Sequence, residues 1–310
     1  MARQRYRVWT ARLIALLFIA TIVAAGLRWW WLSVTKSEVA LPQTTLTQPS
    51  SPPENPIDVV ASVLAHPLDE VLELAREALR KHRENHQDYT ATLLKTERIG
   101  KVLAPSNTIF LKLRYNPLQS NEASRSINVY LKFLEPKAQA GREVLFAPER
   151  NNGMLKAHEG GLLGLLSVDL TPNSVLAMRG NRHPITELGI EKLLTKLIEK
   201  GERDRKLGDC QVVRTDGETI DGRPCERIDV IHPQKRVIHE GEPIDHEFFM
   251  ARIWFDKEKL IPLKYASYAW PLEEGGEPLL EEEYTYMDLK LNVGLDDEDF
   301  DVNNPDYRFP

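Results

Sequence analysis

Two runs of alternating polarity, Ile109–Tyr115 and Ile127–Leu134, constrain the fold of this 310-residue chain most. Every second position is apolar, with Ile109, Leu111 and Leu113 in the first run and Val129, Leu131 and Phe133 in the second. Most positions between them carry lysine, arginine, asparagine or tyrosine. A period of two is typical of β-strands with one apolar and one solvated face. The two runs therefore predict a sheet whose apolar face other elements must cover.

Similar patterns recur along the chain and predict a mostly antiparallel sheet. We expect further strands at Tyr89–Ile99, Glu143–Phe146, Met154–His158, Cys210–Ile220, Pro224–His232, Phe248–Asp256, Ile261–Trp270 and Glu282–Val293. Helices are predicted at residues 56–65, at 68–85, and at 186–200, where Gly201 should end the helix. The fold class that follows is α+β, with a curved antiparallel sheet covered by helices.

The N-terminal segment combines basic residues with an apolar run. Four arginines among the first twelve residues precede an uncharged run at 13–27, and three tryptophans follow at 29–31. If the segment extends to about Val34, Arg28 reaches the membrane surface and the tryptophans lie in the interfacial belt. We predict an uncleaved anchor that spans the inner membrane once, with the rest of the chain outside the cytoplasm. Signal-peptide cleavage after Ala25 is the alternative.

Proline, serine and threonine are frequent in the next segment, residues 36–55. Such a composition cannot bury a core and favours an extended, semi-rigid chain. The predicted organisation is therefore an anchor at residues 1–35, a linker at 36–55 and a folded domain at 56–310.

The sequence carries no motif for catalysis, nucleic-acid binding or a cofactor. A formal net charge of −6 argues against a nucleic-acid partner. G-x-S-x-G, P-loop and dinucleotide-binding glycine patterns are absent. The histidines at 158, 183, 232, 239 and 246 are scattered, without the spacing of a metal cluster. We therefore expect neither an enzyme nor a cofactor nor a metal site.

Two stretches resemble metal sites but lack required residues. His82 and His86 lie one helical turn apart, but the glutamate of HRENH is misplaced for a zinc protease and the neighbours are basic. A solvated helix end is expected there. In Asp296–Asp306, Val302 stands where a calcium-binding loop requires glycine. An acidic closing segment is expected instead.

The two cysteines, Cys210 and Cys225, lie in a predicted hairpin. A turn at residues 221–222 pairs Glu218 with Cys225 and leaves Cys210 several residues away. A turn at 216–217 brings the two cysteines nearly opposite each other. The sequence leaves both registers open, and with them a disulfide, which would persist outside the cytoplasm.

Three segments carry a resemblance to a known family: DYTATLLKTERIG, FLEPKAQAGREVLFAP and ARIWFDKEKLIPLKYASY. The last has the pattern of a strand, a charged turn and a strand. From residue 68 to 309 the order of elements resembles the LolA/LolB/RseB superfamily, and within it the bacterial domain of unknown function 1571. The resemblance implies a half-barrel, whose sheet curls without closing and whose concave face holds lipid or acyl chains.

On this resemblance, the concave face is the expected ligand site. The expected ligand-binding residues are Leu111, Leu113, Leu131, Phe133, Phe146, Trp254, Tyr265 and Leu289. The loop at 160–166 and the helix at 186–200 would act as a lid. The same side chains form an ordinary core unless the half-barrel is too wide for them to fill.

The implied function is a membrane-anchored, extracytoplasmic and non-catalytic module that binds an amphiphile or a lipid-modified partner, such as a lipid, an acyl chain or a lipoprotein. The alternative is an envelope sensor or protein-interaction domain, as RseB is. An envelope hydrolase is a third class, which would need a catalytic constellation that the sequence does not supply.

Overall fold

In the computed structural model, which describes residues 66–118, 124–161, 166–208 and 210–310, the two alternating runs are neighbouring strands. They form β3 (Asn107–Tyr115) and β4 (Ile127–Glu135), which pair in antiparallel fashion. The register joins the predicted apolar positions, with Ile109 opposite Phe133, Leu111 opposite Leu131 and Leu113 opposite Val129. The prediction of one shared apolar face is confirmed.

A twelve-stranded antiparallel sheet contains these strands, in the order β7-β6-β5-β4-β3-β1-β14-β13-β12-β9-β8, with β2 paired to β1 beside this path. The remaining strands of the sheet are β1 (Asp88–Ile99), β2 (Val102–Leu103), β5 (Glu143–Phe146), β6 (Leu155–His158), β7 (Ser167–Leu170), β8 (Gln211–Ile220), β9 (Arg223–Ile231), β12 (Met250–Asp256), β13 (Pro262–Ala269) and β14 (Leu279–Leu291). A separate hairpin joins β10 (Arg236–His239) to β11 (Glu242–Asp245). Every predicted strand is present, and the fold class is confirmed. The strands that the sequence did not reveal have two to four residues, too few to establish a period.

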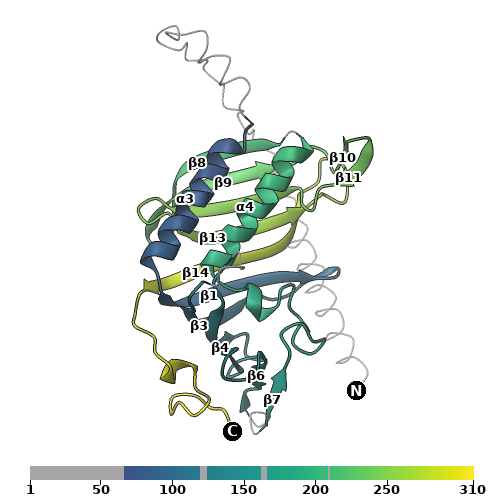
Figure 1. The fold of residues 1–310 in the computed structure, drawn as a ribbon. Coiled ribbons are helices and arrows are strands. Elements are labelled where there is room, and N and C mark those ends of the chain that lie inside the picture. The colour runs from purple at the N-terminus through teal and green to yellow at the C-terminus, as the bar shows by residue number, and fades with distance from the viewer. Residues whose placement is uncertain (1–65, 119–123, 162–165, 209) are drawn as a thin grey trace, which may run out of the picture. The chain divides into compact units, whose positions relative to one another are not determined.

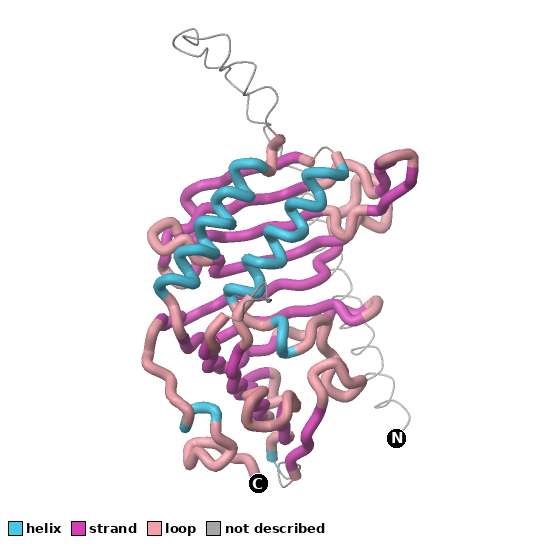
Figure 2. Tube along the Cα trace, in the orientation of Figure 1, coloured by secondary structure: helices cyan, strands magenta, loops and turns pink. Residues whose placement is uncertain are grey.

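Two helices, α3 (Asp69–Asn85) and α4 (Ile190–Leu207), lie side by side across one face of the sheet, over β8, β9, β13 and β14 (Figures 1 and 2). α3 begins and ends close to the predicted bounds. It buries the predicted apolar stripe through Leu72, Ala75 and Ala78.

The predicted bounds of the second helix were wrong at both ends. A short 3₁₀ helix, η2 (Ile185–Glu187), precedes α4, and α4 continues through Gly201 to Leu207. A Cβ atom at position 201 would lie 2.8 Å from Leu72 Cδ2 on α3. Gly201 therefore allows the two helices to approach closely, and does not end the helix.

The C-terminal segment covers the opposite face of β3, β4 and β5. Phe300, in the 3₁₀ helix η3 (Glu298–Phe300), is buried with Tyr130 and Leu145, and Tyr307 stacks on Tyr130 at a ring-centroid distance of 3.8 Å. The acidic side chains of this segment pair with bases that point outward from β3. Lys112 Nζ lies 2.6 Å from Asp299, and Arg114 lies 2.6 Å from Asp297. The predicted acidic closing segment thus packs against the face that the alternation predicted to be solvated.

We expect Phe300→Ala to lower the free energy of unfolding by about 3–5 kcal/mol, because it removes a buried aromatic ring. The side chain of Phe300 is only 1% exposed. Urea unfolding followed by circular dichroism measures the change. Val293→Ala is the matched control, since Val293 lies in the same segment but is 43% exposed. Equal midpoints for the Phe300 variant and the unmodified protein would contradict the packing of this segment.

His82 is buried, which corrects the prediction of a solvated helix end. Its side chain is 1% exposed, and its Nε2 lies 3.0 Å from the hydroxyl of Tyr115 on β3. The Nδ1 atoms of His82 and His86 lie 3.2 Å apart. Burial, followed by the charge of His86, lowers the pKa of His82 to about 3. The basic neighbours that suggested exposure lie on the other sides of α3.

The pKa of His82 predicts a loss of stability in mild acid. In the unfolded chain this histidine takes up a proton below its usual pKa of about 6.5, whereas the folded protein does so only near pH 3. The contribution of His82 to stability is therefore fully present above pH 6.5. As the pH falls from 6.5 to about 3, the free energy of unfolding should decrease by about 1.4 kcal/mol per pH unit. Urea unfolding at pH 7.5 and 5 measures this slope. It should be reduced in His82→Gln and retained in the control His239→Gln. Equal slopes in the two variants would refute the assignment.

The register of the hairpin around the cysteines follows the turn at residues 221–222. Glu218 lies opposite Cys225. Cys210 directly precedes β8, at the end of that strand away from the turn, so the two cysteines are not joined to each other. A disulfide at this position is therefore not part of the fold.

The predicted anchor, linker and first helix fall at residues 1–65 and lie outside the described residues, as does most of the predicted loop at 160–166. Within the part of the chain that the structure describes, every helix is too short or too polar to cross a membrane.

Candidate ligand-binding cavity

A cavity of about 540 Å³ lies on the helix-facing side of the sheet. Strands β1 and β3–β7 line it on one side, with β13 and β14 at one end; residues 172–189 and the first half of α4 line it on the other. Most of the wall is apolar, formed by residues such as Leu93, Ile109, Leu131, Phe133, Val144, Leu155, Ala157, Leu170, Leu188, Leu193 and Leu197. Cavities of about 300–1,000 Å³ with mainly apolar walls are typical of small-molecule sites.

The sheet has a filled half and a hollow half. Between the two helices and strands β9, β12 and β13, the remaining space is only about 40 Å³. Leucine, valine and alanine side chains of the two amphipathic helices fill that half, together with Ile253 and Phe255 of β12. Over β4–β7 there is no second helix in the described residues, and the irregular segment 172–189 leaves the cavity beneath it. The apolar face of the sheet is therefore a packed core under the two helices and a pocket under residues 172–189.

One side of the cavity is open to solvent. Leu166, Val168 and Leu176 line it and are nevertheless 78%, 50% and 65% exposed. Exposed apolar side chains that gather at the edge of a cavity are typical of ligand entrances. Of the loop at 160–166, which was predicted to act as a lid, the structure describes Gly160, Gly161 and Leu166.

Of the residues predicted to bind a ligand, Leu131, Phe133 and Tyr265 line the cavity. The others are buried and do not line it: Leu111, Leu113, Phe146 and Leu289 lie in the core on the same side of the sheet, and Trp254 lies on the other face. For the three lining residues, ligand binding stays a prediction.

Trp254 points away from the helices, because Ile253 and Phe255 on either side of it face α3 and α4. Its indole N–H donates to Glu218, and the ammonium group of Lys264 lies 5.0 Å from its ring centroid. These polar partners, on the face of the sheet opposite the helices, thus fix the position of the Trp254 side chain.

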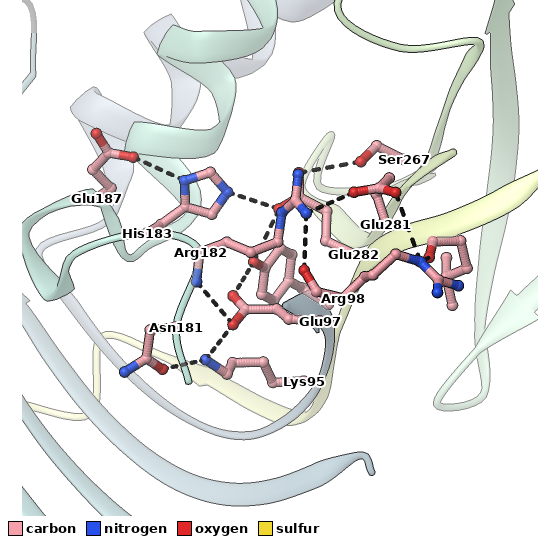
Figure 3. Close-up of polar contacts among 12 residues, drawn as sticks. Lys95, Glu97, Arg98, Asn181, Arg182, His183, Glu187, Ser267, Glu281 and Glu282 are labelled. Atoms are coloured by element: carbon pink, nitrogen blue, oxygen red, sulfur yellow. Dashed lines mark hydrogen bonds and ion pairs between the residues drawn. The ribbon is translucent and has the colours of Figure 1, made fainter. Parts of the chain in front are cut away.

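A polar network forms one end of the cavity and is centred on two buried carboxylates, Glu97 on β1 and Glu282 on β14 (Figure 3). The hydroxyl of Tyr284 lies 2.5 Å from Glu97 and 3.2 Å from Glu282. Burial, followed by the charge of Glu282, raises the pKa of Tyr284 well above its usual value. The hydroxyl therefore keeps its proton and donates to these carboxylates.

Glu97 holds the middle of residues 172–189, the segment that covers the cavity and is called the roof segment from here on. Its Oε2 accepts hydrogen bonds from the ammonium group of Lys95 at 2.8 Å and from the backbone N–H of Arg182 at 3.1 Å. Lys95 in turn donates to Asn181 at 2.6 Å (Figure 3). These bonds tie residues 181 and 182 to strand β1.

Glu282 holds the next residue of the roof. Its Oε2 lies 2.7 Å from His183 Nε2, and its Oε1 accepts from Ser267 at 3.2 Å (Figure 3). Burial alone would raise the pKa of Glu282, but the hydrogen bond from His183 and the charges of His183 and Arg182 bring it below its usual value. Ser267 donates to the carboxylate and not to His183, so these residues position the roof and do not form a nucleophile–base pair.

Sequence reasoning missed this network because residues that bond directly within it are up to 187 positions apart in the chain. One signal was available. Lys95 and Glu97 continue the alternating face of Tyr89, Ala91 and Leu93. Charged residues at positions of an apolar face indicate that part of the face borders a polar site.

The first turn of α4 is fixed by buried polar groups. The hydroxyls of Tyr89 and Tyr115 accept hydrogen bonds from the backbone N–H groups of residues 190 and 191, at 3.3 and 3.2 Å. Glu191, fully buried, accepts from Arg125 Nε at 2.6 Å and from Arg83 at 3.0 Å. These bonds join α3, α4 and the start of β4, and so fix the helix that borders the cavity.

Several solved structures match this chain at low sequence identity. A putative outer membrane lipoprotein-sorting protein domain from Vibrio parahaemolyticus is 15% identical, with a TM-score of 0.33, over 75% of this chain and 96% of that chain. The MucA/MucB complex of Pseudomonas aeruginosa gives 15% identity and a TM-score of 0.38, over 73% of this chain and 60% of that chain. A LolA superfamily protein from Nitrosomonas europaea gives 13% identity and a TM-score of 0.26, over 73% and 97%.

Comparison with curated protein sequences gives no match. A family model, in contrast, covers well over half of the chain and confirms the family resemblance seen in the sequence. The chain belongs to the DUF1571 family, described as proteins of unknown function, whose model matches residues 86–309.

Proposed function

We propose that this protein is a non-catalytic carrier or receptor that holds the acyl chain of an amphiphile in the cavity between the sheet and residues 172–189. The observation that carries this proposal is the cavity of about 540 Å³, with its apolar wall and its open, apolar edge. Each methylene group buried there contributes about 0.8 kcal/mol of transfer free energy. An acyl chain therefore binds by burial alone and needs few polar contacts.

The polar group of the amphiphile is proposed to be anionic and to lie at Arg179. Arg179 lines the cavity, is exposed, and forms no ion pair with any residue that the structure describes. The other bases at the cavity wall are paired, for example Lys95 with Glu97 and Lys196 with Glu187. An arginine that remains available beside an apolar entrance suits a carboxylate or phosphate group.

The proposed location is the outer side of the inner membrane. In support, the arginines, the apolar run and the tryptophans of residues 1–35 suit a single-pass anchor, and residues 36–55 suit an extended linker. A domain tethered in this way meets lipids and lipid-modified proteins at the membrane surface.

Binding of a dansyl-labelled fatty acid to the full-length protein tests the proposal. The probe should fluoresce more strongly on binding, and an anionic phospholipid or an acylated peptide should displace it, depending on which one the cavity serves. Arg179→Glu should weaken binding about tenfold, since it replaces attraction with repulsion at the entrance. The control is Arg203→Glu on the far end of α4. A probe that stays dim with the unmodified protein would refute the proposal.

A further inference from the structure

Three buried side chains from separate elements meet beside the end of α4. Asp204 lies on α4, His232 directly follows β9, and His246 directly follows β11. They are 5%, 0% and 4% exposed. One potential ligand atom from each lies within 4.8 Å of the other two. This cluster is separate from the cavity, whose lining contains none of the three.

The hydrogen bonds of His232 leave one ring nitrogen aimed at Asp204. His232 Nδ1 lies 3.1 Å from the carbonyl oxygen of Phe248, so this nitrogen carries the proton and donates it. Nε2 then presents a lone pair. It lies 3.4 Å from Asp204 Oδ2 and makes no hydrogen bond with a described residue. A ring N–H held by a backbone carbonyl is the usual arrangement of a metal-binding histidine.

His246 also faces this carboxylate. Its Nδ1 lies 3.6 Å from Asp204 Oδ1 and is likewise buried without a hydrogen bond to a described residue. The two imidazole rings stack at a centroid distance of 4.0 Å and an angle of 14°. Buried polar atoms are nearly always paired, so two unpaired nitrogens that face one carboxylate indicate a missing partner.

The spacing of these atoms suits a shared cation better than a proton. A charge-assisted N–H···O bond is about 2.7–2.9 Å long, shorter than either separation here. Two ligands that each lie about 2.0–2.1 Å from one Zn²⁺ ion in tetrahedral geometry are about 3.4 Å apart. The separations of 3.4 Å from His232 to Oδ2 and of 3.6 Å from His246 to Oδ1 are each close to that edge, so either carboxylate oxygen can serve as the ligand.

The surrounding charges permit a cation at this point. Asp204 supplies one negative charge to the cluster. The neighbouring base, Arg203, is paired with Glu247, and so is Lys200 at 2.9 Å. Glu247 therefore offsets one of these two positive charges, and the carboxylate of Asp204 offsets the other.

We propose that Asp204, His232 and His246 bind one divalent transition-metal ion, for which Zn²⁺ is the probe. Two imidazoles and a carboxylate are ligands that Zn²⁺ commonly takes, with a fourth position left for water. The ion would join the last turns of α4 to β9 and to the β10–β11 hairpin. Its role would be structural, because it fixes the end of the helix whose other end borders the cavity.

Zinc titration of the full-length protein, after treatment with a chelator and dialysis, tests this site. Elemental analysis should find one Zn²⁺ per chain. Calorimetry should show Tm rising by about 5–10 °C at a zinc concentration about 100 times Kd. Co²⁺ in place of Zn²⁺ should give the visible absorption of a four-coordinate site with nitrogen and oxygen ligands.

Variants identify the ligands. Asp204→Asn, His232→Gln and His246→Gln should each weaken zinc binding more than about 100-fold. His239→Gln, in the neighbouring strand β10, is the matched control and should bind zinc as the unmodified protein does. Near-ultraviolet circular dichroism checks that each variant is folded. If zinc changes neither Tm nor the Co²⁺ spectrum of the unmodified protein, or if all four variants bind it equally, the proposal is overturned.

Discussion

Replacing Glu191 with alanine is expected to lower the free energy of unfolding by about 3–5 kcal/mol, because it leaves a buried arginine without its carboxylate. The side chains of Glu191 and Arg125 are 0% and 6% exposed, and their closest atoms lie 2.6 Å apart. The backbone N–H of Arg125 also donates to Glu191, at 2.9 Å. One carboxylate thus accepts from both the backbone and the guanidinium group of Arg125, and its removal leaves these buried donors unpaired.

Urea unfolding followed by circular dichroism measures this loss. Glu202→Ala is the matched control on the same helix, since Glu202 pairs with Arg76 at 2.9 Å but both side chains are more than 40% exposed. That variant should change the unfolding free energy by less than about 1 kcal/mol. If removing Arg125 together with Glu191 restores part of the stability, the loss comes from the uncompensated charge. Equal losses for Glu191→Ala and the control would contradict the network.

Replacing Ala157 with tryptophan is expected to weaken binding of an acyl probe at least about 100-fold, because the indole occupies the space of the ligand. Ala157 lines the cavity from β6, where its side chain faces the roof segment and not the packed core under the helices. Losing burial of four methylene groups alone amounts to about 3 kcal/mol, which is more than a 100-fold change in Kd. Fluorescence titration with the dansyl-labelled fatty acid measures the effect.

Val213→Trp is the control for a new tryptophan at a strand position. Val213 lies on β8 at the far end of the sheet and is 44% exposed. This variant should bind the probe as the unmodified protein does. Equal binding by the Ala157 and Val213 variants would place the ligand elsewhere.

The sheet and helix α3 were predictable from the sequence because each obeys a local rule. A period of two, as in β3 and β4, is visible in the local sequence without information about neighbouring strands, and so is the apolar stripe of α3. The end of α4 was not predictable, since Gly201 serves the contact with Leu72 on another helix. A glycine that ends a helix and one that permits close packing look the same in one sequence.

The candidate sites were less predictable, because they depend on contacts between distant residues. Glu97 meets Glu282 through Tyr284, and His232 meets Asp204, only after the sheet has formed. Spacing along the chain, on which the expectation of no metal site was based, carries no information about such contacts. The cavity itself depends on which half of the sheet the helices cover, and no local pattern records that.

The central claim, that the cavity holds an acyl chain, is tested most directly by mass spectrometry of the lipids that accompany the full-length protein. The protein should be purified from its native membranes and compared with the Ala157→Trp variant prepared in the same way. The account predicts an acylated, anionic molecule at close to one per chain in the unmodified protein and its loss from the variant. Equal lipid content in the two preparations, or no lipid in either, would contradict the account.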